Sequence, residues 1–329
     1  MAKKSSGPTM KDVAKEANVA IGTVSKVINN MPVGEEYRTR IEAAIQKLDY
    51  RVNYYAKGLR SNSTYTVALI VPNLINPYFC RIASCVNKNL AQNGYQMLLC
   101  CSEYDMVQEQ NLVSLAEQKK VDGIICLSYN PNLKITEDFP FVSIDRYFGG
   151  KIPCISSDNY GGGIMAAEKL IECGCKNPVM FWTGLSLPHE PTKRRDGFTD
   201  ACKSAGLPCH IQCVGEGVPF SVFEDYLKEH MKNGKSDIDG IFCVTDTLAV
   251  KTVKLLRGMG LRVPEDVQVI GFDGIRNMGD MEYLCSTIVQ PVEQLAEACV
   301  NLILNKDNKN TPTLMCLPVQ YQFGGTTKF

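Results

Sequence analysis

The chain has 329 residues and a mass of 36.4 kDa, which predicts two or three globular units rather than one core. Hydrophobic residues make up 45% of the sequence and charged residues 21%, and this average composition excludes a disordered or fibrous chain. The apolar runs are far shorter than the roughly 18 residues of a membrane helix. The N-terminal MAKKSSGPTM lacks the apolar stretch of a signal peptide, so we expect a cytoplasmic protein with no membrane partner.

The net charge of zero combines a basic N-terminal part with an acidic remainder. Residues 1–64 hold seven lysines and four arginines against six acidic residues, a net charge of +5, so the rest carries −5. This asymmetry is expected when only the N-terminal part of a chain meets a polyanion such as nucleic acid.

The chain contains 15 cysteines, an odd number, and no CxxC pair. Cys173 with Cys175, or Cys209 and Cys213 with His210 between them, could contribute zinc ligands. Structural zinc sites, however, have a second pair at a defined spacing. We therefore expect no metal, and reduced cysteines that pack as small apolar side chains in a reducing compartment.

Three short helices are predicted within residues 9–50. The apolar spacing places them at 10–17, 21–29 and 35–48, and Thr9 with Asp12 matches a capping box at the first. Two short helices braced by a third form the helix-turn-helix layout, although a three-helix bundle without a ligand has the same pattern. The positive charge favours DNA, as does the polar outer face of the second helix, formed by Gly22, Ser25, Lys26 and Asn29.

Residues 51–63 form a polar, basic connector, after which apolar strands alternate with amphipathic helices. Such strands are typical of parallel sheets covered on both faces. The strands are expected at 67–71, 95–101, 123–128, 141–145, 154–158, 179–184, 210–214, 240–246 and 267–273. We therefore predict an all-α head at 1–50, a linker at 51–63 and an α/β core at 64–329. The core is expected to form two doubly wound lobes, an N-lobe of about 64–158 plus 291–318 and a C-lobe of about 159–288 plus 319–329.

Polar and aromatic side chains follow several of the predicted strands, where parallel sheets bind their ligands. Carboxylates and guanidinium groups can hold vicinal hydroxyls, and flat aromatic side chains can cover the apolar face of a ring. Any one of these residues could be a helix cap or part of a surface ion pair. Together they predict a small polyhydroxylated ligand between the lobes, held by Asn76, Tyr78, Phe79, Asp145, Arg146, Trp182, Arg194, Asp246 and Asp273.

An enzyme is the main alternative, because GGGIMA at 161–166 fits the dinucleotide-binding pattern G-x-G-x-x-G/A. The next predicted strand, 179–184, has no acidic residue at its end to hold a ribose hydroxyl. The sequence has no P-loop or nucleophile elbow, and His189, His210 and His230 form no recognisable acid–base arrangement. We therefore expect neither catalysis nor a cofactor.

Several stretches carry a family signature. TMKDVAKEANVAIGTVSKVINN and TRIEAAIQKLDYRVNYYAKGLRS closely resemble the DNA-binding head and hinge of lactose-repressor (LacI/GalR) family regulators. The similarity continues through VALIVPNLINPYF, FVSIDR, SSDNYGGG, RRDGF, GIFCVTDTLAV and VIGFD, and covers residues 9–325. The resemblance implies a homodimeric repressor that binds a pseudo-palindromic operator in double-stranded DNA. It also implies a small carbohydrate effector, held in a core like that of periplasmic sugar-binding proteins.

The resemblance also assigns residues by position. In the recognition helix, Ile21, Gly22 and Lys26 would face base edges, and Thr23, Ser25 and Asn29 would contact phosphates or bases nearby. Asn53, Ala56 and Leu59 match the hinge helix, whose leucine enters the minor groove. The effector-pocket positions of the family fall on Tyr78, Phe79, Asp145, Arg146, Arg194, Asp246 and Asp273.

Departures from the family pattern and two other protein classes bear on this interpretation. Ala20 replaces the serine that usually caps the recognition helix, a loss expected to weaken operator binding. Thr245 replaces the usual asparagine before Asp246, and Gly274 replaces a common second acidic residue, so the effector is expected to differ from familiar ones. A solute-binding protein would need an export signal and no basic head. A sugar-modifying enzyme would need an acid–base pair or a metal cluster, and neither is visible in the sequence.

Overall fold

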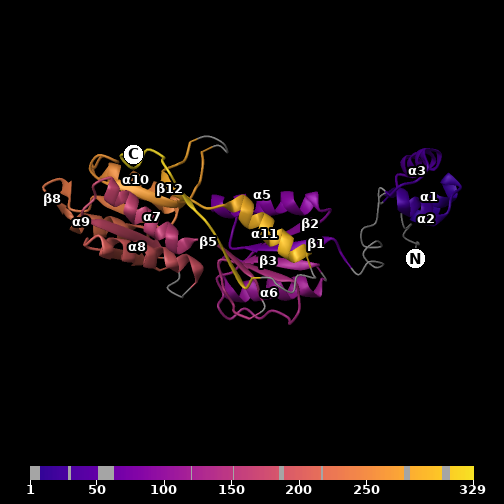
Figure 1. The fold of residues 1–329 in the computed structure, drawn as a ribbon, viewed down its shortest axis with the longest axis horizontal. Coiled ribbons are helices and arrows are strands. Elements are labelled where there is room, and N and C mark those ends of the chain that lie inside the picture. The colour runs from indigo at the N-terminus through magenta and orange to yellow at the C-terminus, as the bar shows by residue number, and fades with distance from the viewer. Residues whose placement is uncertain are drawn as a thin grey trace, which may run out of the picture. The chain divides into compact units, whose positions relative to one another are not determined.

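The computed structural model describes residues 8–28, 31–50, 63–119, 121–150, 152–184, 189–215, 218–277, 282–305 and 312–329. The chain divides into two compact units: Met1–Thr64, which holds the predicted head and linker, and Tyr65–Phe329, which holds the core. Figure 1 shows the helices and strands of each unit.

The described part of the head contains three helices, α1 (Met10–Ala17), α2 (Ile21–Ile28) and α3 (Glu35–Lys47). The predicted capping box starts α1, where the backbone N–H and the hydroxyl of Thr9 donate to Asp12 Oδ2 at 2.8 and 2.7 Å. Asn18 ends α1 in the left-handed conformation, with a φ of 51°. Arg40 of α3 donates to the carbonyl oxygen of Ala17 at 2.7 Å, so α3 satisfies an acceptor at the C-terminal end of α1.

The N-lobe of the core has a parallel six-stranded sheet in the order β13-β5-β4-β3-β1-β2. Its strands are β1 (Thr66–Val71), β2 (Gln96–Cys101), β3 (Gly123–Leu127), β4 (Phe141–Ile144), β5 (Cys154–Ser157) and β13 (Leu314–Leu317). Helices α5 (Pro77–Gln92) and α11 (Val292–Leu304) lie on one face, and α6 (Met106–Gln118) lies on the other (Figure 1). The strands are thus covered on both sides, as their continuous apolar sequences predict.

The C-lobe sheet has the order β14-β12-β11-β10-β6-β7, and only β14 is antiparallel to its neighbour. Its strands are β6 (Pro178–Thr183), β7 (His210–Val214), β10 (Gly240–Cys243), β11 (Gln268–Asp273), β12 (Ser286–Val289) and β14 (Gln320–Gln322). Its helices are α7 (Asn159–Glu172), α8 (Lys193–Ser204), α9 (Ser221–Glu229), α10 (Asp246–Gly258) and the short 3-10 helix η1 (Glu190–Thr192).

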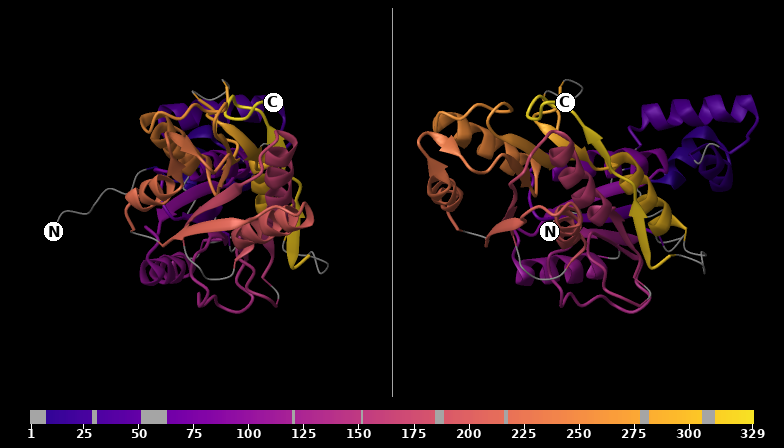
Figure 2. Two further views of the ribbon diagram at one scale, coloured as in Figure 1. Left: turned by 90° about the vertical axis from the view of Figure 1, so that its left-hand side faces the viewer. Right: turned by 60° about the vertical axis from the view of Figure 1, so that its left-hand side comes forward.

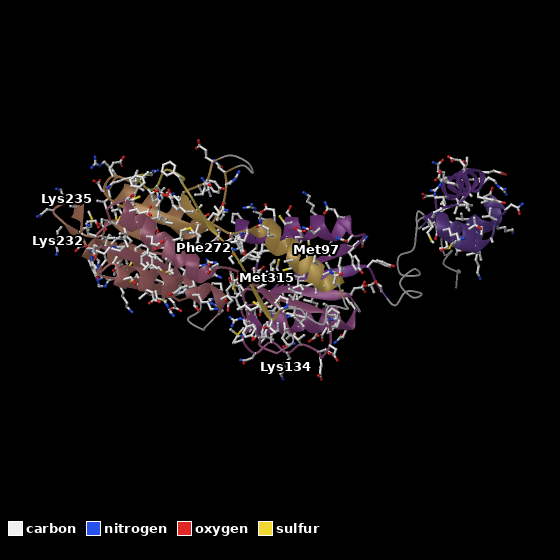
Figure 3. The ribbon with its side chains drawn as sticks, in the orientation of Figure 1. Met97, Lys134, Lys232, Lys235, Phe272 and Met315 are labelled. Atoms are coloured by element: carbon white, nitrogen blue, oxygen red, sulfur yellow. The ribbon has the colours of Figure 1, made fainter. Side chains whose placement is uncertain are left out.

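A small hairpin projects from the C-lobe after α9. It consists of β8 (Met231–Lys232) and β9 (Lys235–Ser236), and its lysines lie at the end of the core away from Met97 and Met315 of the N-lobe (Figure 3). The chain passes between the lobes after β5, after β12 and after β13 (Figure 2). Both lobes therefore contain segments that lie far apart in the sequence.

Each of the nine strands expected from the sequence is present within a few residues of its predicted limits. Strands β12, β13 and β14 were not predicted as strands; each has only three or four residues, and β12 and β14 also contain polar residues. The α/β class and the helical head agree with the sequence prediction.

The glycines of the GGGIMA stretch let α7 pack closely against its neighbours. A Cβ atom on Gly163 would lie 2.1 Å from the carbonyl oxygen of Arg194, and one on Gly162 would lie 2.7 Å from the Phe272 ring. The side chain of Asp158 already accepts a hydrogen bond from the Gly161 N–H at 2.9 Å. This stretch therefore serves helix packing and capping, which accounts for its match to the dinucleotide-binding pattern.

We expect Gly163→Ala to lower the free energy of unfolding by about 3 kcal/mol, because the added methyl group must displace the backbone of α8. Urea unfolding followed by circular dichroism measures the change. Gly258→Ala is the matched control, since no atom lies within 4 Å of its added Cβ. It should leave the protein equally stable or raise its stability by up to about 1 kcal/mol. Equal stabilities of the two variants would contradict this packing argument.

Candidate functional site

The outward face of α2 is the candidate DNA-reading surface of the head. Val24 and Val27 are buried against the other two helices, which leaves Ile21, Gly22 and Lys26 exposed. Among the residues that the structure describes, Lys26 has no carboxylate within ion-pair distance. A Cβ on Gly22 would meet no atom within 4 Å, so this position is open to an approaching molecule.

Thr23 and Ser25 lie beside this face and are half-buried. Asn29, Asn53, Ala56 and Leu59 lie outside the described residues. The first turn of α2 has no side-chain cap in the described part of the head, as expected with Ala20 at that position, and the N–H of Thr23 donates to the Ala20 carbonyl oxygen at 2.9 Å.

The second candidate site is a pocket between the two lobes of the core. Its empty space amounts to about 540 Å³, the opening to solvent included. The N-lobe contributes Asn76, Tyr78, Phe79, Leu127, Tyr129 and Asp145. The C-lobe contributes Trp182, Thr183, Gly184, His189, Pro191, Arg194, Val244, Thr245 and Asp273, and Gln290 lies on a connection between the lobes.

Two carboxylates face this pocket from the carboxyl ends of strands. Asp145 follows β4 and Asp273 ends β11, and both have positive φ angles, 61° and 135°, that non-glycine residues rarely adopt. Burial raises the pKa of both carboxyl groups, and the nearby guanidinium of Arg194 opposes the rise. Strained, desolvated carboxylates of this kind cluster at ligand-binding sites.

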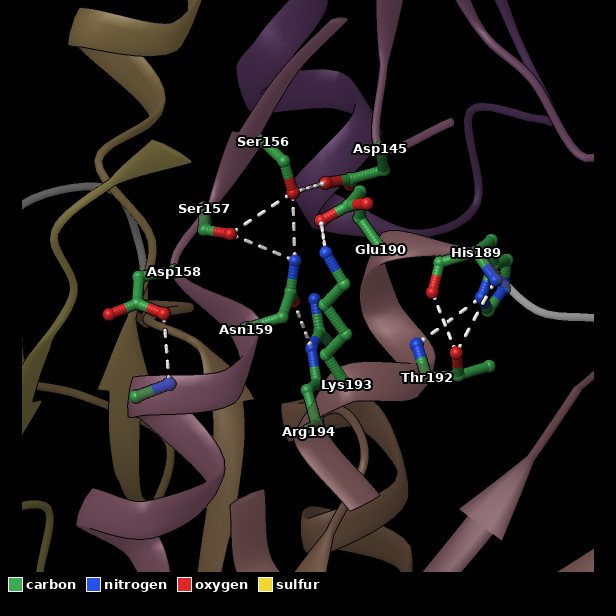
Figure 4. Close-up of polar contacts among 11 residues, drawn as sticks. Asp145, Ser156, Ser157, Asp158, Asn159, His189, Glu190, Thr192, Lys193 and Arg194 are labelled. Carbon is green, nitrogen blue, oxygen red and sulfur yellow. Dashed lines mark hydrogen bonds and ion pairs between the residues drawn. The ribbon is translucent and has the colours of Figure 1, made fainter. Parts of the chain in front are cut away.

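A relay of hydrogen bonds joins Arg194 of the C-lobe to Asp145 of the N-lobe (Figure 4). Arg194 Nε donates to Asn159 Oδ1 at 2.7 Å, and the amide of Asn159 donates to the Ser156 hydroxyl at 2.8 Å. That hydroxyl donates to Asp145 Oδ1 at 2.7 Å. The Arg194 guanidinium also lies 3.6 Å from the centre of the Phe272 ring. The relay holds in place one cation from the C-lobe and one carboxylate from the N-lobe, both of which line the pocket.

Two buried polar atoms of the pocket have no hydrogen-bond partner among the described residues, the Tyr78 hydroxyl and Asp273 Oδ2. The other oxygen of Asp273 accepts from Gln290 Nε2 at 2.7 Å. Unsatisfied buried polar atoms cost roughly 1–3 kcal/mol each, and a ligand that supplies hydroxyl groups would satisfy both.

The aromatic side chains of Tyr129, Trp182 and His189 also line the pocket. The ring centres of Tyr129 and His189 lie 6.0 Å apart, and those of Trp182 and His189 lie 6.4 Å apart. These rings come from both lobes, so they can cover the apolar face of a ligand from either side.

The comparisons with known proteins match this architecture. Residues 9–53 match the family described as bacterial regulatory proteins, lacI family. Residues 64–311 match periplasmic binding proteins and the sugar binding domain of the LacI family. The sucrose operon repressor of Streptococcus mutans is 32% identical over 315 residues, 94% of this chain and 96% of that protein.

The chain belongs to the LacI family. It is a DNA-binding transcriptional regulator with an effector-binding core.

Two solved structures show the same fold. A periplasmic binding protein/LacI transcriptional regulator from Alkaliphilus metalliredigens, complexed with D-xylulofuranose, is 27% identical with a TM-score of 0.66. The match covers 80% of this chain and all of that one. The lac repressor dimer bound to operator and an anti-inducer has a TM-score of 0.80 at 19% identity, over 98% of this chain and 100% of that one.

Most residues that the sequence assigned to the effector pocket of this LacI-family protein line it. Arg146 and Asp246 do not line it, because each is buried behind residues that do. Arg146 Nε donates to the Ser128 carbonyl oxygen at 3.2 Å and so supports the segment that carries Tyr129. Asp246 accepts from the Ile275 N–H at 2.6 Å and so holds the chain that follows Asp273. Both act on the pocket through their neighbours.

The sequence analysis missed five polar or aromatic residues of the pocket, one of them Thr183 at the end of β6. Tyr129 follows β3, a strand end that was available in the sequence, and Thr245 was noted only as a departure from the family pattern. Gln290 follows β12, which was not predicted as a strand. His189 lies before η1, and its sequence surroundings carry no signal for the pocket.

His189 is expected to make stability depend on pH. Burial, together with the charge of Arg146, lowers the pKa of His189 from 6.5 to about 4. The unfolded chain therefore takes up a proton at a higher pH than the native state. The stabilising contribution is complete above pH 6.5 and is lost as the pH falls toward 4, by up to about 3 kcal/mol.

Unfolding free energies at pH 7.5 and pH 4.5 measure this loss. His189→Gln should reduce the difference between the two values by about 2–3 kcal/mol. His210→Gln, at an exposed histidine, should leave it unchanged. The same pH dependence in wild type and His189→Gln would show that this histidine is not responsible.

None of the described helices is both long and apolar enough to cross a membrane. In the part of the chain that the structure describes, no three His, Cys, Asp or Glu side chains gather as a metal site would require.

Proposed function

We propose that this regulator is a cytoplasmic homodimer that represses transcription by binding a pseudo-palindromic operator, and that a neutral sugar bound between its lobes controls operator affinity. Two heads on a dimeric core would meet two half-sites related by two-fold symmetry. The lac repressor dimer bound to operator, which shares the fold, supports this arrangement. The name of the Streptococcus mutans relative supports repression as the output.

In the proposed complex, α2 lies in the major groove with Ile21, Gly22 and Lys26 toward the bases. Thr23, Ser25 and Asn29 contact phosphates or bases nearby. Residues 51–63 form the hinge between the head (1–50) and the core (64–329), and Leu59 enters the minor groove beside Asn53 and Ala56. Support for this assignment comes from the exposed face of α2 and from the family match over residues 9–53.

The chemistry of the pocket favours an uncharged polyol. Asp145 and Asp273 can accept hydrogen bonds from sugar hydroxyls, and Arg194 can donate to a ring or hydroxyl oxygen. A phosphate ester would place two negative charges beside these two carboxylates, and Arg194 is the one cationic side chain among the lining residues that the structure describes. The unsatisfied Tyr78 hydroxyl and Asp273 Oδ2 are the observation that carries the proposal, because they are buried and still need partners.

A thermal-shift panel tests the ligand class. Sucrose, fructose, xylulose and ribose are the first sugars to test, each beside a phosphate ester of the same sugar. A neutral sugar that binds the native state should raise the melting temperature. At 100 times its Kd, the sugar would stabilise the native state by about 2.7 kcal/mol. Its phosphate ester should have no effect. A shift with the phosphate esters alone would overturn the proposal of a neutral effector.

A further inference from the structure

Two thiols of the C-lobe lie close together, and neither lines the effector pocket. Cys202 lies in the last turns of α8, and Cys209 directly precedes β7. Cys209 Sγ donates to Thr199 Oγ1 at 3.7 Å, and Thr199 lies three residues before Cys202 on the same side of α8. Cys209 packs against the core cluster that contains Cys202, so the two sulfurs lie close together. The backbone between them forms a turn in which the Leu207 N–H donates to the Cys202 carbonyl oxygen at 3.0 Å.

The two thiols differ in exposure. Cys202 is fully buried, whereas Cys209 is half-buried between Pro208 and His210, which are both exposed. A small oxidant in solution can therefore reach Cys209, while Cys202 is shielded from it and lies beside the sulfur that would react. This is the arrangement of a reactive thiol with a resolving thiol.

We propose that Cys209 is a peroxide-reactive site and that Cys202 resolves its oxidised form into an intramolecular disulfide.

The electrostatics of the pair favour the thiolate at Cys209. The pKa of Cys209 is lowered, first by the neighbouring Cys202 thiol, and Thr199 and Lys203 act in the same direction. The pKa of Cys202 is raised by the same contact and by burial. The charged and titratable groups that act on Cys209 are thus Cys202 and Lys203, both on α8. Because the thiolate is the nucleophile, Cys209 is expected to react first with peroxide. Cys202 is then expected to react with the oxidised Cys209.

The reaction takes two steps. The Cys209 thiolate attacks one oxygen of hydrogen peroxide, an S–O bond forms, the O–O bond breaks, and the departing hydroxide takes up a proton to become water. Cys209 has then lost two electrons and is a sulfenic acid. The Cys202 sulfur, on losing its proton, attacks the sulfenic sulfur, the S–S bond forms, and the S–O bond breaks with release of a second water.

Peptide mapping of the full-length protein tests the proposal. Trypsin cuts after Arg195, Lys203 and Lys228, so the disulfide would join peptide 196–203 to peptide 204–228. The second peptide also holds Cys213, an exposed thiol on β7, and the Cys213→Ser background therefore assigns the linkage without ambiguity. After brief treatment with hydrogen peroxide at pH 7, the joined peptide should be the predominant disulfide product and should disappear on reduction.

Alkylation and trapping separate the two roles. At pH 7, iodoacetamide should modify Cys209 at least tenfold faster than the exposed Cys213. Cys202→Ala should leave Cys209 as a sulfenic acid that dimedone traps, and Cys202→Ser repeats the test if alanine impairs folding. Cys209→Ser should give neither product. Peroxide treatment that leaves peptides 196–203 and 204–228 unlinked, or alkylation of Cys209 no faster than that of Cys213, would overturn the proposal.

Discussion

Arg194→Ala should weaken effector binding by roughly 30- to 150-fold, while the operator affinity of the effector-free protein stays unchanged. The guanidinium lines the pocket and is held by Asn159 and by the Val244 carbonyl oxygen at 2.7 and 2.8 Å. Its Nη2 has no hydrogen-bond partner among the described residues and is free to donate to a sugar oxygen. Loss of one such charged hydrogen bond costs about 2–3 kcal/mol.

Isothermal titration calorimetry with the sugar found by thermal shift measures this loss. Arg195→Ala is the matched control, because Arg195 is half-buried and pairs with Asp196 instead of lining the pocket. Since Arg194 also supports Asn159, the unfolding free energy of the variant must be measured beside its affinity. A folded Arg194→Ala protein that binds the sugar as tightly as wild type would remove Arg194 from the proposed site.

Lys26→Ala should lower affinity for the selected operator by roughly 10- to 100-fold and relax the preference at one base pair of each half-site. An exposed lysine on a recognition helix can donate to the O6 and N7 atoms of guanine, and such a contact contributes about 1–3 kcal/mol of discrimination. Lys26 is suited to this role because it is exposed on α2 and has no carboxylate partner among the described residues.

Anisotropy titrations with the operator and with a scrambled duplex separate base readout from phosphate contact. Lys47→Ala is the control, because it removes a positive charge from the head at α3, where Lys47 pairs with Glu16 at 2.7 Å. Equal loss on both duplexes in Lys26→Ala would make Lys26 a phosphate contact instead.

Much of the fold follows from local sequence patterns. The continuous apolar strands, such as β1 and β3, predict a parallel sheet because both of their faces are buried. The cap at Thr9 and the turn at Asn18 follow from the local chemistry of those residues. The short strands β12, β13 and β14 escaped prediction because their positions depend on pairing with distant segments.

The sequence predicted those pocket residues that lie at the carboxyl end of a strand, such as Asp145 and Asp273. Arg146 and Asp246 satisfied the same rule but are buried behind the lining, since a sequence position does not determine which way a side chain points. His189 and Gln290 reach the pocket only through the tertiary fold, so no local pattern could have identified them. The role of Gly163 likewise depends on α8, which contacts it from 31 residues away.

The most direct test of the coupling between pocket and head is to measure the affinity of the protein for its operator duplex with and without bound sugar. A saturating concentration of the sugar should change operator affinity about 5- to 150-fold, in line with coupling free energies of 1–3 kcal/mol. In Arg194→Ala, a sugar concentration that only just saturates the wild-type protein should change operator affinity far less. Identical operator affinity of the wild-type protein in the presence and absence of a sugar that calorimetry shows to be bound would contradict the account.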